Sequence, residues 1–232
     1  MVRYGEADGV MALQTLERGR VSAFAKGVRR PTSKLRGRLQ PGVVVQLELA
    51  PGKGELHSIR GAQVIDANAG LWVQGYRLQA ASSILEATLR VTPEEEENPG
   101  PFHLLARGLA LLAVSPPRPT PPRLDPLVLS VQLKLILSAG LLPQLAACVV
   151  CGRGDDLPGF SARLGGMLCE GCQERGEVMD GPIRAALVAM VGRPLADAAE
   201  ACPPSACAGV ERVIGLVLRE HLGVELRSAT PL

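Results

Sequence analysis

The chain has 232 residues, of which 47% are hydrophobic and 3% are aromatic. This length allows one large or two small domains, and the apolar share is enough for a core built mostly from Leu, Val and Ala. The most apolar run (127–142) contains Gln132 and Lys134 and is too short to cross a bilayer, and no export signal is visible at the N-terminus. We therefore expect a cytoplasmic protein in a reducing compartment, where stable disulfides are not expected.

Charge is unevenly distributed along the chain. The formal net charge is +2, yet residues 1–75 contain 11 Lys and Arg against 6 Asp and Glu, whereas the remainder contains 14 against 17. A basic front and a mildly acidic back predict that the N-terminal part binds a polyanion.

Residues 1–66 have the sequence pattern of a small all-β domain. Runs rich in β-branched residues alternate with turn signals such as Pro51-Gly52-Lys53-Gly54. Four or five short strands with tight turns predict a small barrel, either SH3-like or an OB-fold. The expected strands are 10–16, 20–26, 43–50, 55–59 and 62–65.

After Asp66 the hydrophobic period changes to that of helices. A Pro-rich connector (115–123) cannot be helical inside and separates the second expected helix from the third. The pattern predicts a helical bundle, which a cysteine-rich segment interrupts between its third and fourth helices. The expected helices are 76–91, 102–114, 126–139, 183–191 and 209–223.

Four cysteines follow the spacing C-x2-C-x17-C-x2-C between residues 148 and 172. This spacing is typical of a structural zinc site, because a two-residue gap lets both thiolates of a pair reach one ion. Four free buried thiols and a thioredoxin-like redox pair are the alternatives, although a redox motif is expected as a single pair. Four protein thiolates leave no open coordination position, so we expect a structural metal. Cys202 and Cys207 are interpreted as incidental small residues in a loop.

Residues 18–38, here called the basic segment, contain eight Lys or Arg and no acidic residue. A solvated charged loop is the alternative. The single sign of the charge, the position on the expected barrel, and Gly and Pro residues that expose backbone N–H groups favour contact with nucleic-acid phosphates. Phe24 is the only aromatic residue of the segment. We therefore expect sequence-tolerant binding with a strong dependence on salt.

No catalytic constellation is apparent in the sequence. His57, His103 and His221 are isolated, and neither a Walker A pattern nor a Rossmann fingerprint is present. The acidic run Glu94–Glu97 lies between prolines and is interpreted as a solvated loop. An enzyme is therefore disfavoured.

Several stretches together resemble RecO, the bacterial recombination-mediator family of DNA repair. The most specific is the AKG-x-RR-x2-S-x-LRG-x-LQP pattern at 25–41, joined to LLP-x-L-x2-C-x2-CG at 141–152 and GG-x2-C-x2-C at 165–172. Supporting stretches in the same order are YGEAD (4–8), GELHSI (54–59) and LREHLGVELRS (218–228). Members of the family usually have a further strand before the YGEAD segment, where this chain has only MVRY.

The resemblance implies an α+β protein, with an N-terminal OB-fold β-barrel (1–70) and a helical domain (71–232) that carries a zinc-binding insertion with four cysteine ligands at about 145–175. It implies binding of single- and double-stranded DNA, annealing of complementary strands, and partnership with RecR and single-stranded DNA-binding protein so that RecA is loaded. The implied DNA-contacting residues are Lys26, Arg29, Arg30, Lys34, Arg36 and Arg38, and the implied ligands of one structural Zn²⁺ are Cys148, Cys151, Cys169 and Cys172.

A bacterial, nucleoid-associated location follows from the same resemblance. Two alternatives stay open from the residues alone, namely a zinc-stabilised redox or hydrolytic enzyme and a protein-interaction scaffold. An acidic partner tail would dock in an apolar groove rimmed by Lys or Arg, for which Lys134 and Arg123 are candidates by position.

Overall fold

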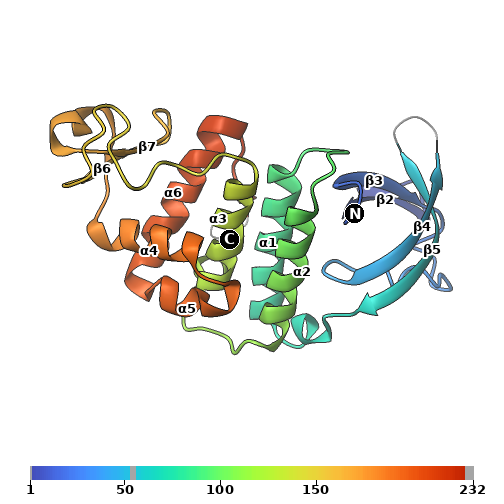
Figure 1. Ribbon diagram of the computed structural model, residues 1–232. Coiled ribbons are helices and arrows are strands. Elements are labelled where there is room, and N and C mark those ends of the chain that lie inside the picture. Colours follow the sequence, from blue (N-terminus) through green and yellow to red (C-terminus); the bar gives the residue numbers. More distant parts are fainter. Residues whose placement is uncertain (1, 53–55, 228–232) are drawn as a thin grey trace. The chain divides into compact units, whose positions relative to one another are not determined.

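The computed structural model describes residues 2–52 and 56–227. The chain divides into two compact units, the first ending at Ser115 and the second beginning at Pro116 (Figure 1). A sheet and two helices make up the first unit, and a helical bundle with a small β-rich insertion makes up the second. The domain boundary that the sequence places at residue 70 stays a prediction.

The first unit begins with a five-stranded sheet of order β1-β2-β3-β5-β4. Neighbouring strands are antiparallel except β3 and β5, which are parallel. This order agrees with the expected OB-fold, although β1 and β4 are unpaired edges within the described residues, so these strands form an open sheet. The strands are β1 (Val2–Tyr4), β2 (Asp8–Gln14), β3 (Arg20–Ala25), β4 (Val44–Pro51) and β5 (His57–Asp66).

Two features of the sheet differ from the sequence expectation. Three residues at the start of the chain, Val2–Tyr4, form the edge strand β1, which pairs with β2. The strands expected at 55–59 and 62–65 are one strand, β5, with Gly61 inside it, and residue 55 lies outside the described residues. Gly61 does not interrupt β5. Because it has no side chain, it leaves room for the side chain of Glu48, next to an irregularity in the register of β4.

The sheet buries one face against its own loops. In β3 the buried Val21, Ala23 and Ala25 alternate with more exposed neighbours, as the period of a half-buried strand requires. Two residues that follow β3, Val28 and Leu39, complete this core. The loop between β3 and β4 is therefore fixed to the sheet by apolar packing.

Two helices complete the first unit, α1 (Gly75–Val91) and α2 (Pro99–Val114), preceded by η1 (Ala69–Trp72). The side chain of Asn98 accepts a hydrogen bond from the backbone of Gly100, which caps α2 and lets it begin earlier than expected. Arg77 of α1 donates to the backbone oxygens of Ala113 and Ser115 at 2.7 and 3.0 Å, so its side chain ties the start of α1 to the end of α2.

The second unit is a bundle around α3 (Pro126–Ser138), which packs against α4, α5 and α6. The surrounding helices are α4 (Gly181–Gly192), α5 (Ala198–Ala201) and α6 (Pro204–Leu222). A short helix η2 (Pro122–Leu124) precedes α3, and η4 (Leu195–Asp197) lies between α4 and α5. The sequence pattern missed α5, which is only four residues long. The helix expected at 209–223 is α6, which begins five residues earlier, at Pro204. It ends at Leu222 and is capped by Gly223, whose φ is 62°.

In the described ranges, no single helix has the length and apolar composition needed to cross a membrane. Only the segments Leu195–Ala201 and Pro204–Leu222 meet that test as a pair, and they are bent by 114°.

Candidate metal centre and nucleic-acid interface

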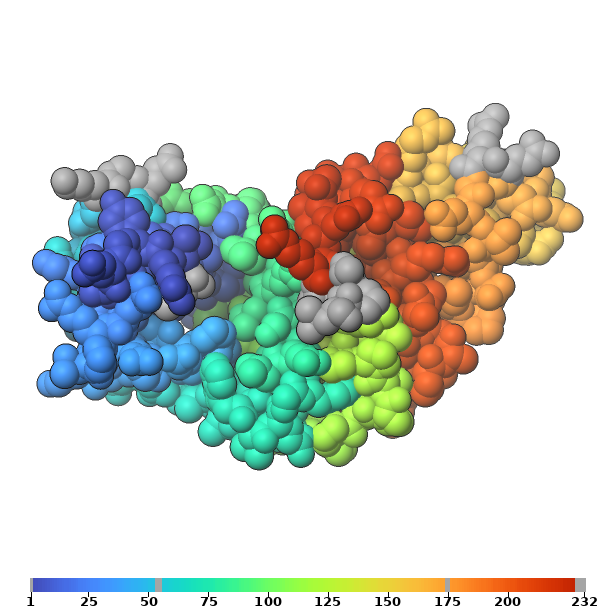
Figure 2. Space-filling view, turned by 180° about the vertical axis from the view of Figure 1, so that it is seen from behind, coloured from blue at the N-terminus to red at the C-terminus, as the bar shows by residue number. Residues whose placement is uncertain are grey.

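The cysteine segment folds as a small β-rich insertion between α3 and α4. It contains β6 (Gly159–Ser161), β7 (Gly166–Leu168) and β8 (Glu177–Val178) in the order β7-β6-β8, and η3 (Glu170–Arg175) follows β7. Phe160, Met167 and Leu168 are buried between these elements. Figures 1 and 2 show the insertion, in yellow and orange, as a lobe at one end of the helices of its unit.

Both cysteine pairs lie in tight backbone turns. The backbone N–H of Gly152 donates to the oxygen of Cys148 at 2.9 Å, and that of Cys172 donates to the oxygen of Cys169 at the same distance. Gly152 has a φ of 78°, a left-handed conformation that favours glycine. These two turns aim the thiols of each pair in one direction.

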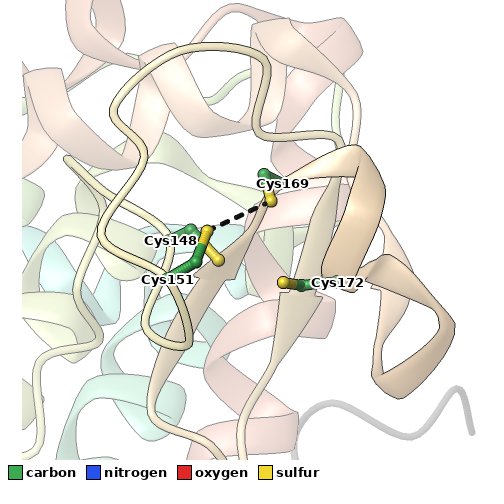
Figure 3. A group of neighbouring side chains, drawn as sticks. All are labelled: Cys148, Cys151, Cys169 and Cys172. Carbon is green, nitrogen blue, oxygen red and sulfur yellow. Dashed lines mark hydrogen bonds between the residues drawn. The ribbon is translucent and has the colours of Figure 1, made fainter.

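The structure brings all four predicted ligands together. Their sulfur atoms lie within 4.8 Å of one another and point toward a common centre (Figure 3). Cys151 Sγ and Cys169 Sγ are 3.5 Å apart. Cys148 and Cys169 are buried, Cys172 is half-buried and Cys151 is exposed. The cluster could hold one metal ion, and the spacing of the sulfurs suits a small tetrahedral site.

The thiols titrate in a way that fits a cation among them. A hydrogen bond from the backbone of Cys169 lowers the pKa of Cys148 to about 6, so this thiol is ionised at neutral pH. Hydrogen bonding with Cys169 raises the pKa of Cys172 to about 12, and hydrogen bonding with Cys151 raises the pKa of Cys169. Crowded sulfurs therefore resist joint ionisation, and a divalent ion that accepts four thiolates would remove this conflict.

The basic segment continues from β3 into a series of tight turns. Gly27, with a φ of 63°, places its backbone N–H 2.6 Å from Asp8 Oδ1. Successive turns follow, in which the N–H groups of Arg30 and Ser33 donate to the oxygens of Gly27 and Arg30 at 3.0 Å. The backbone path is thus defined by hydrogen bonds and by the buried side chains of Val28 and Leu39. In Figure 2 the blue part of the chain, which includes this segment, forms a broad stretch of the surface of its unit.

The six predicted DNA contacts fall into two groups. Two of them support the loop, because Arg29 donates to the backbone oxygen of Glu6 at 3.1 Å and Arg38 donates to that of Ala62 at 2.8 Å. The other four are exposed and form no ion pair with any described residue. They are Lys26, Arg30, Lys34 and Arg36.

One further residue beside the basic segment, Tyr4, was not found from the sequence. Tyr4 of β1 packs edge-on against Phe24 of β3, with ring centroids 5.6 Å apart, and is 60% exposed. Arg29 reaches the turn that directly follows Tyr4. An exposed aromatic ring therefore lies beside the cations of the basic segment. Its position follows from the pairing of strands in the sheet and is not apparent from the sequence. A concave pocket of about 630 Å³, lined by Arg38, Glu48 and Val64, lies over β4 and β5 of the same sheet.

The acidic loop between α1 and α2 is not simply solvated. Glu94 Oε1 accepts hydrogen bonds from Arg20 Nη1 at 2.9 Å and from the Ser22 hydroxyl at 3.1 Å. Glu95 Oε1 lies 3.3 Å from His57 Nε2. Arg20 belongs to the basic segment, so one of its cations is already paired with a carboxylate of the same unit.

The two docking candidates on the helical unit are both engaged internally. Lys134 Nζ donates to the Val191 backbone oxygen at 2.8 Å near the end of α4, and burial lowers the pKa of this lysine. Arg123 Nε lies 3.0 Å from Glu211 Oε1. Neither side chain is therefore a free cation at the rim of a docking groove.

A different groove has the chemistry expected for an acidic, apolar tail. It lies between the insertion and α4, has a volume of about 870 Å³, and is lined by Val178, Met179 and Val188 together with Arg184 and Arg193. Two carboxylates, those of Asp156 and Asp180, also line it.

Comparison with known proteins identifies related sequences along the whole chain. A family model described as "Recombination protein O N terminal" matches residues 1–68, and "Recombination protein O C terminal" matches residues 74–230. A protein of Heliobacterium modesticaldum called DNA repair protein RecO is 36% identical over 178 residues, which are 74% of this chain and 62% of that protein. Proteins with the same name are 31% identical in an Anaeromyxobacter species, covering 97% of this chain and 89% of the relative, and 33% identical in a Nocardioides species, covering 97% and 92%.

Proposed function

Because this chain belongs to the RecO family, whose curated members are named DNA repair proteins, we propose that it is a non-enzymatic recombination mediator. It binds single- and double-stranded DNA, anneals complementary strands, and acts with RecR to load RecA onto DNA that single-stranded DNA-binding protein covers. The observation that carries the DNA-binding part is the set of four exposed cations without ion pairs on the anchored loop after β3.

Phosphate contacts supply the affinity in this proposal. Lys26, Arg30, Lys34 and Arg36 project from a loop whose backbone is already ordered, so little conformational entropy is lost when phosphates bind. Because such contacts do not read bases, binding tolerates any sequence. Tyr4 adds a ring on which one base of a single strand stacks.

The same surface supports annealing. Two complementary strands repel each other through their phosphates, and a surface that neutralises several phosphates on each lowers this repulsion. Since sequence is then read by base pairing between the strands, the protein itself needs no base-specific contacts.

The insertion holds one structural Zn²⁺ in this proposal. Cys148, Cys151, Cys169 and Cys172 would fill the tetrahedral coordination shell, so the ion orders the lobe and takes no part in chemistry. The groove between this lobe and α4 is the docking site that we propose for the acidic tail of a partner such as single-stranded DNA-binding protein. Arg184 Nε donates to the Leu145 backbone oxygen at 2.8 Å, and Arg193 lies 3.7 Å from the exposed Glu200, so a carboxylate of the tail would share Arg184 and displace Glu200 from Arg193.

The experiment that tests DNA binding is a charge reversal of the four exposed cations. We expect the Lys26→Glu, Arg30→Glu, Lys34→Glu, Arg36→Glu variant to lose binding of a fluorescent oligonucleotide while its circular dichroism is unchanged. A matched control reverses two exposed arginines elsewhere, Arg107 and Arg163, and should bind nearly as the parent does. Unchanged affinity of the fourfold variant at low salt would refute the assignment.

A further inference from the structure

Cys202 and Cys207 form a thiol pair that the DNA-binding proposal and the metal cluster leave unexplained. Expected as incidental residues in a loop, they lie at the junction of two helices, Cys202 directly after α5 and Cys207 in the first turn of α6. Their side chains are 0% and 1% exposed, and their Sγ atoms are 3.4 Å apart. The two thiols are therefore in direct contact in the bundle.

The backbone holds these thiols in position. The segments ending at Ala201 and beginning at Pro204 meet at 114°, and the corner between them is Cys202-Pro203. A proline ring fixes φ near −65°, and Pro203 has that value, so the corner has little freedom. The backbone N–H of Cys202 donates to Ala198 at 3.1 Å, which fixes the other side of the corner. Contact between the thiols is thus built into the fold.

The hydrogen bond between the two thiols shifts their pKa values in opposite directions. Hydrogen bonding with Cys202 lowers the pKa of Cys207, while hydrogen bonding with Cys207 raises the pKa of Cys202. Arg118 and Asp125 act on Cys207 with opposite signs and smaller weight. Cys207 also lies in the first turn of α6, where the positive end of the helix favours a thiolate, so we take Cys207 as the nucleophile.

A small oxidant has a short route to this pair. Of the four residues between the two cysteines, Pro203, Pro204 and Ser205 are exposed and Ala206 is buried, so the thiols lie beneath the first turn of α6. Fraying of the first turn of α6, with the corner at Pro203 unchanged, would admit a molecule of the size of hydrogen peroxide without disturbing α3.

We propose that Cys202 and Cys207 are a reversible dithiol–disulfide site that a peroxide oxidises. The Cys207 thiolate attacks one peroxide oxygen and the O–O bond breaks, which leaves a sulfenic acid on Cys207 and a hydroxide that takes up a proton to become water. The Cys202 sulfur then attacks the Cys207 sulfur, the S–O bond breaks, and the second oxygen leaves as water. Two thiols lose two electrons and two protons, and one peroxide becomes two waters. A dithiol reductant restores the pair.

This site suits a reducing compartment, where disulfides are transient rather than structural. Its geometry needs only a small approach of the sulfurs, from contact to the bond length of about 2 Å. The product would close a short covalent loop at the corner between α5 and α6 and fix the angle of these segments. The proposal does not depend on DNA binding.

The test uses the full-length, metal-loaded protein. It is treated with hydrogen peroxide, quenched with N-ethylmaleimide and digested with trypsin, which places both cysteines in one peptide, 185–212, that contains no metal-site cysteine. We expect this peptide to lose the mass of two hydrogen atoms and to carry no maleimide, and to carry two maleimides after prior reduction. If it carries two maleimides after peroxide, or gains oxygen on one cysteine without losing the two hydrogens, the proposal is wrong.

Two variants identify the nucleophile. In Cys202→Ser the sulfenic acid on Cys207 has no resolving thiol, so a dione probe should label Cys207, whereas in Cys207→Ser the probe should leave Cys202 unlabelled. The reverse pattern would overturn the proposed order of attack. The parent protein alone decides whether the disulfide forms, so the test stands even if a variant folds poorly.

Discussion

The most informative perturbation removes the four exposed cations of the basic segment without reversing them. The variant Lys26→Gln, Arg30→Gln, Lys34→Gln, Arg36→Gln leaves Arg29 and Arg38 in place, because these two hold backbone oxygens of the unit. It also keeps the apolar anchors of the loop. We therefore expect the fold to persist and only the phosphate contacts to be lost.

The magnitude follows from counterion release. Each phosphate neutralised on single-stranded DNA contributes about −0.7 to the slope of log affinity against log salt, so four contacts give roughly −2.8. Removing all four leaves a slope near zero. When salt rises from about 50 to about 200 mM, the parent should lose affinity about 50-fold and the variant should lose almost none.

The assay is fluorescence anisotropy of a labelled single strand at several salt concentrations. The control Arg107→Gln, Arg163→Gln removes exposed charge away from the basic segment and should keep the parental slope. If the slope of the fourfold variant equals that of the parent, the phosphate contacts lie on another surface and the reasoning fails.

Three further outcomes test separate parts of the structure. Cys148→Ser should abolish binding of the single zinc, measured by elemental mass spectrometry, and should raise amide hydrogen exchange in β6 and β7. In the parent protein, zinc retention should fall as the pH is lowered, because protons compete with the metal for the thiolates. Arg29→Ala should lower the melting temperature by about 2–4 °C, the equivalent of about 1 kcal/mol for one solvent-exposed hydrogen bond, whereas Arg30→Ala should leave it unchanged in the same calorimetric scan. Glu94→Gln should tighten DNA binding about twofold at low salt, because it removes the carboxylate that is paired with Arg20. If the effect persists at high salt, its origin is not electrostatic.

Local sequence patterns were sufficient where the structure itself is local. Alternation of apolar residues located β3, and the two-residue gaps between cysteines predicted turns that bring each pair of thiols together. The strand order with β3 parallel to β5 agrees with the OB-fold that the family resemblance implied.

What the sequence did not reveal depends on contacts between distant segments. Glu94 was interpreted as solvated because nothing near it in the chain indicates that α1 returns the loop to Arg20. Contact between Cys202 and Cys207 required the bend between α5 and α6, and α5 is too short to show a period. The supporting role of Arg29 was likewise hidden, because its partner is the turn after β1.

The most direct test of the mediator role is an annealing assay with two complementary single strands coated by single-stranded DNA-binding protein. We expect the parent to accelerate duplex formation at low salt, and the variant lacking the charges of Lys26, Arg30, Lys34 and Arg36 to fall to the uncatalysed rate. Equal annealing by the two proteins, or none by the parent, would contradict the proposal that this basic surface brings DNA strands together.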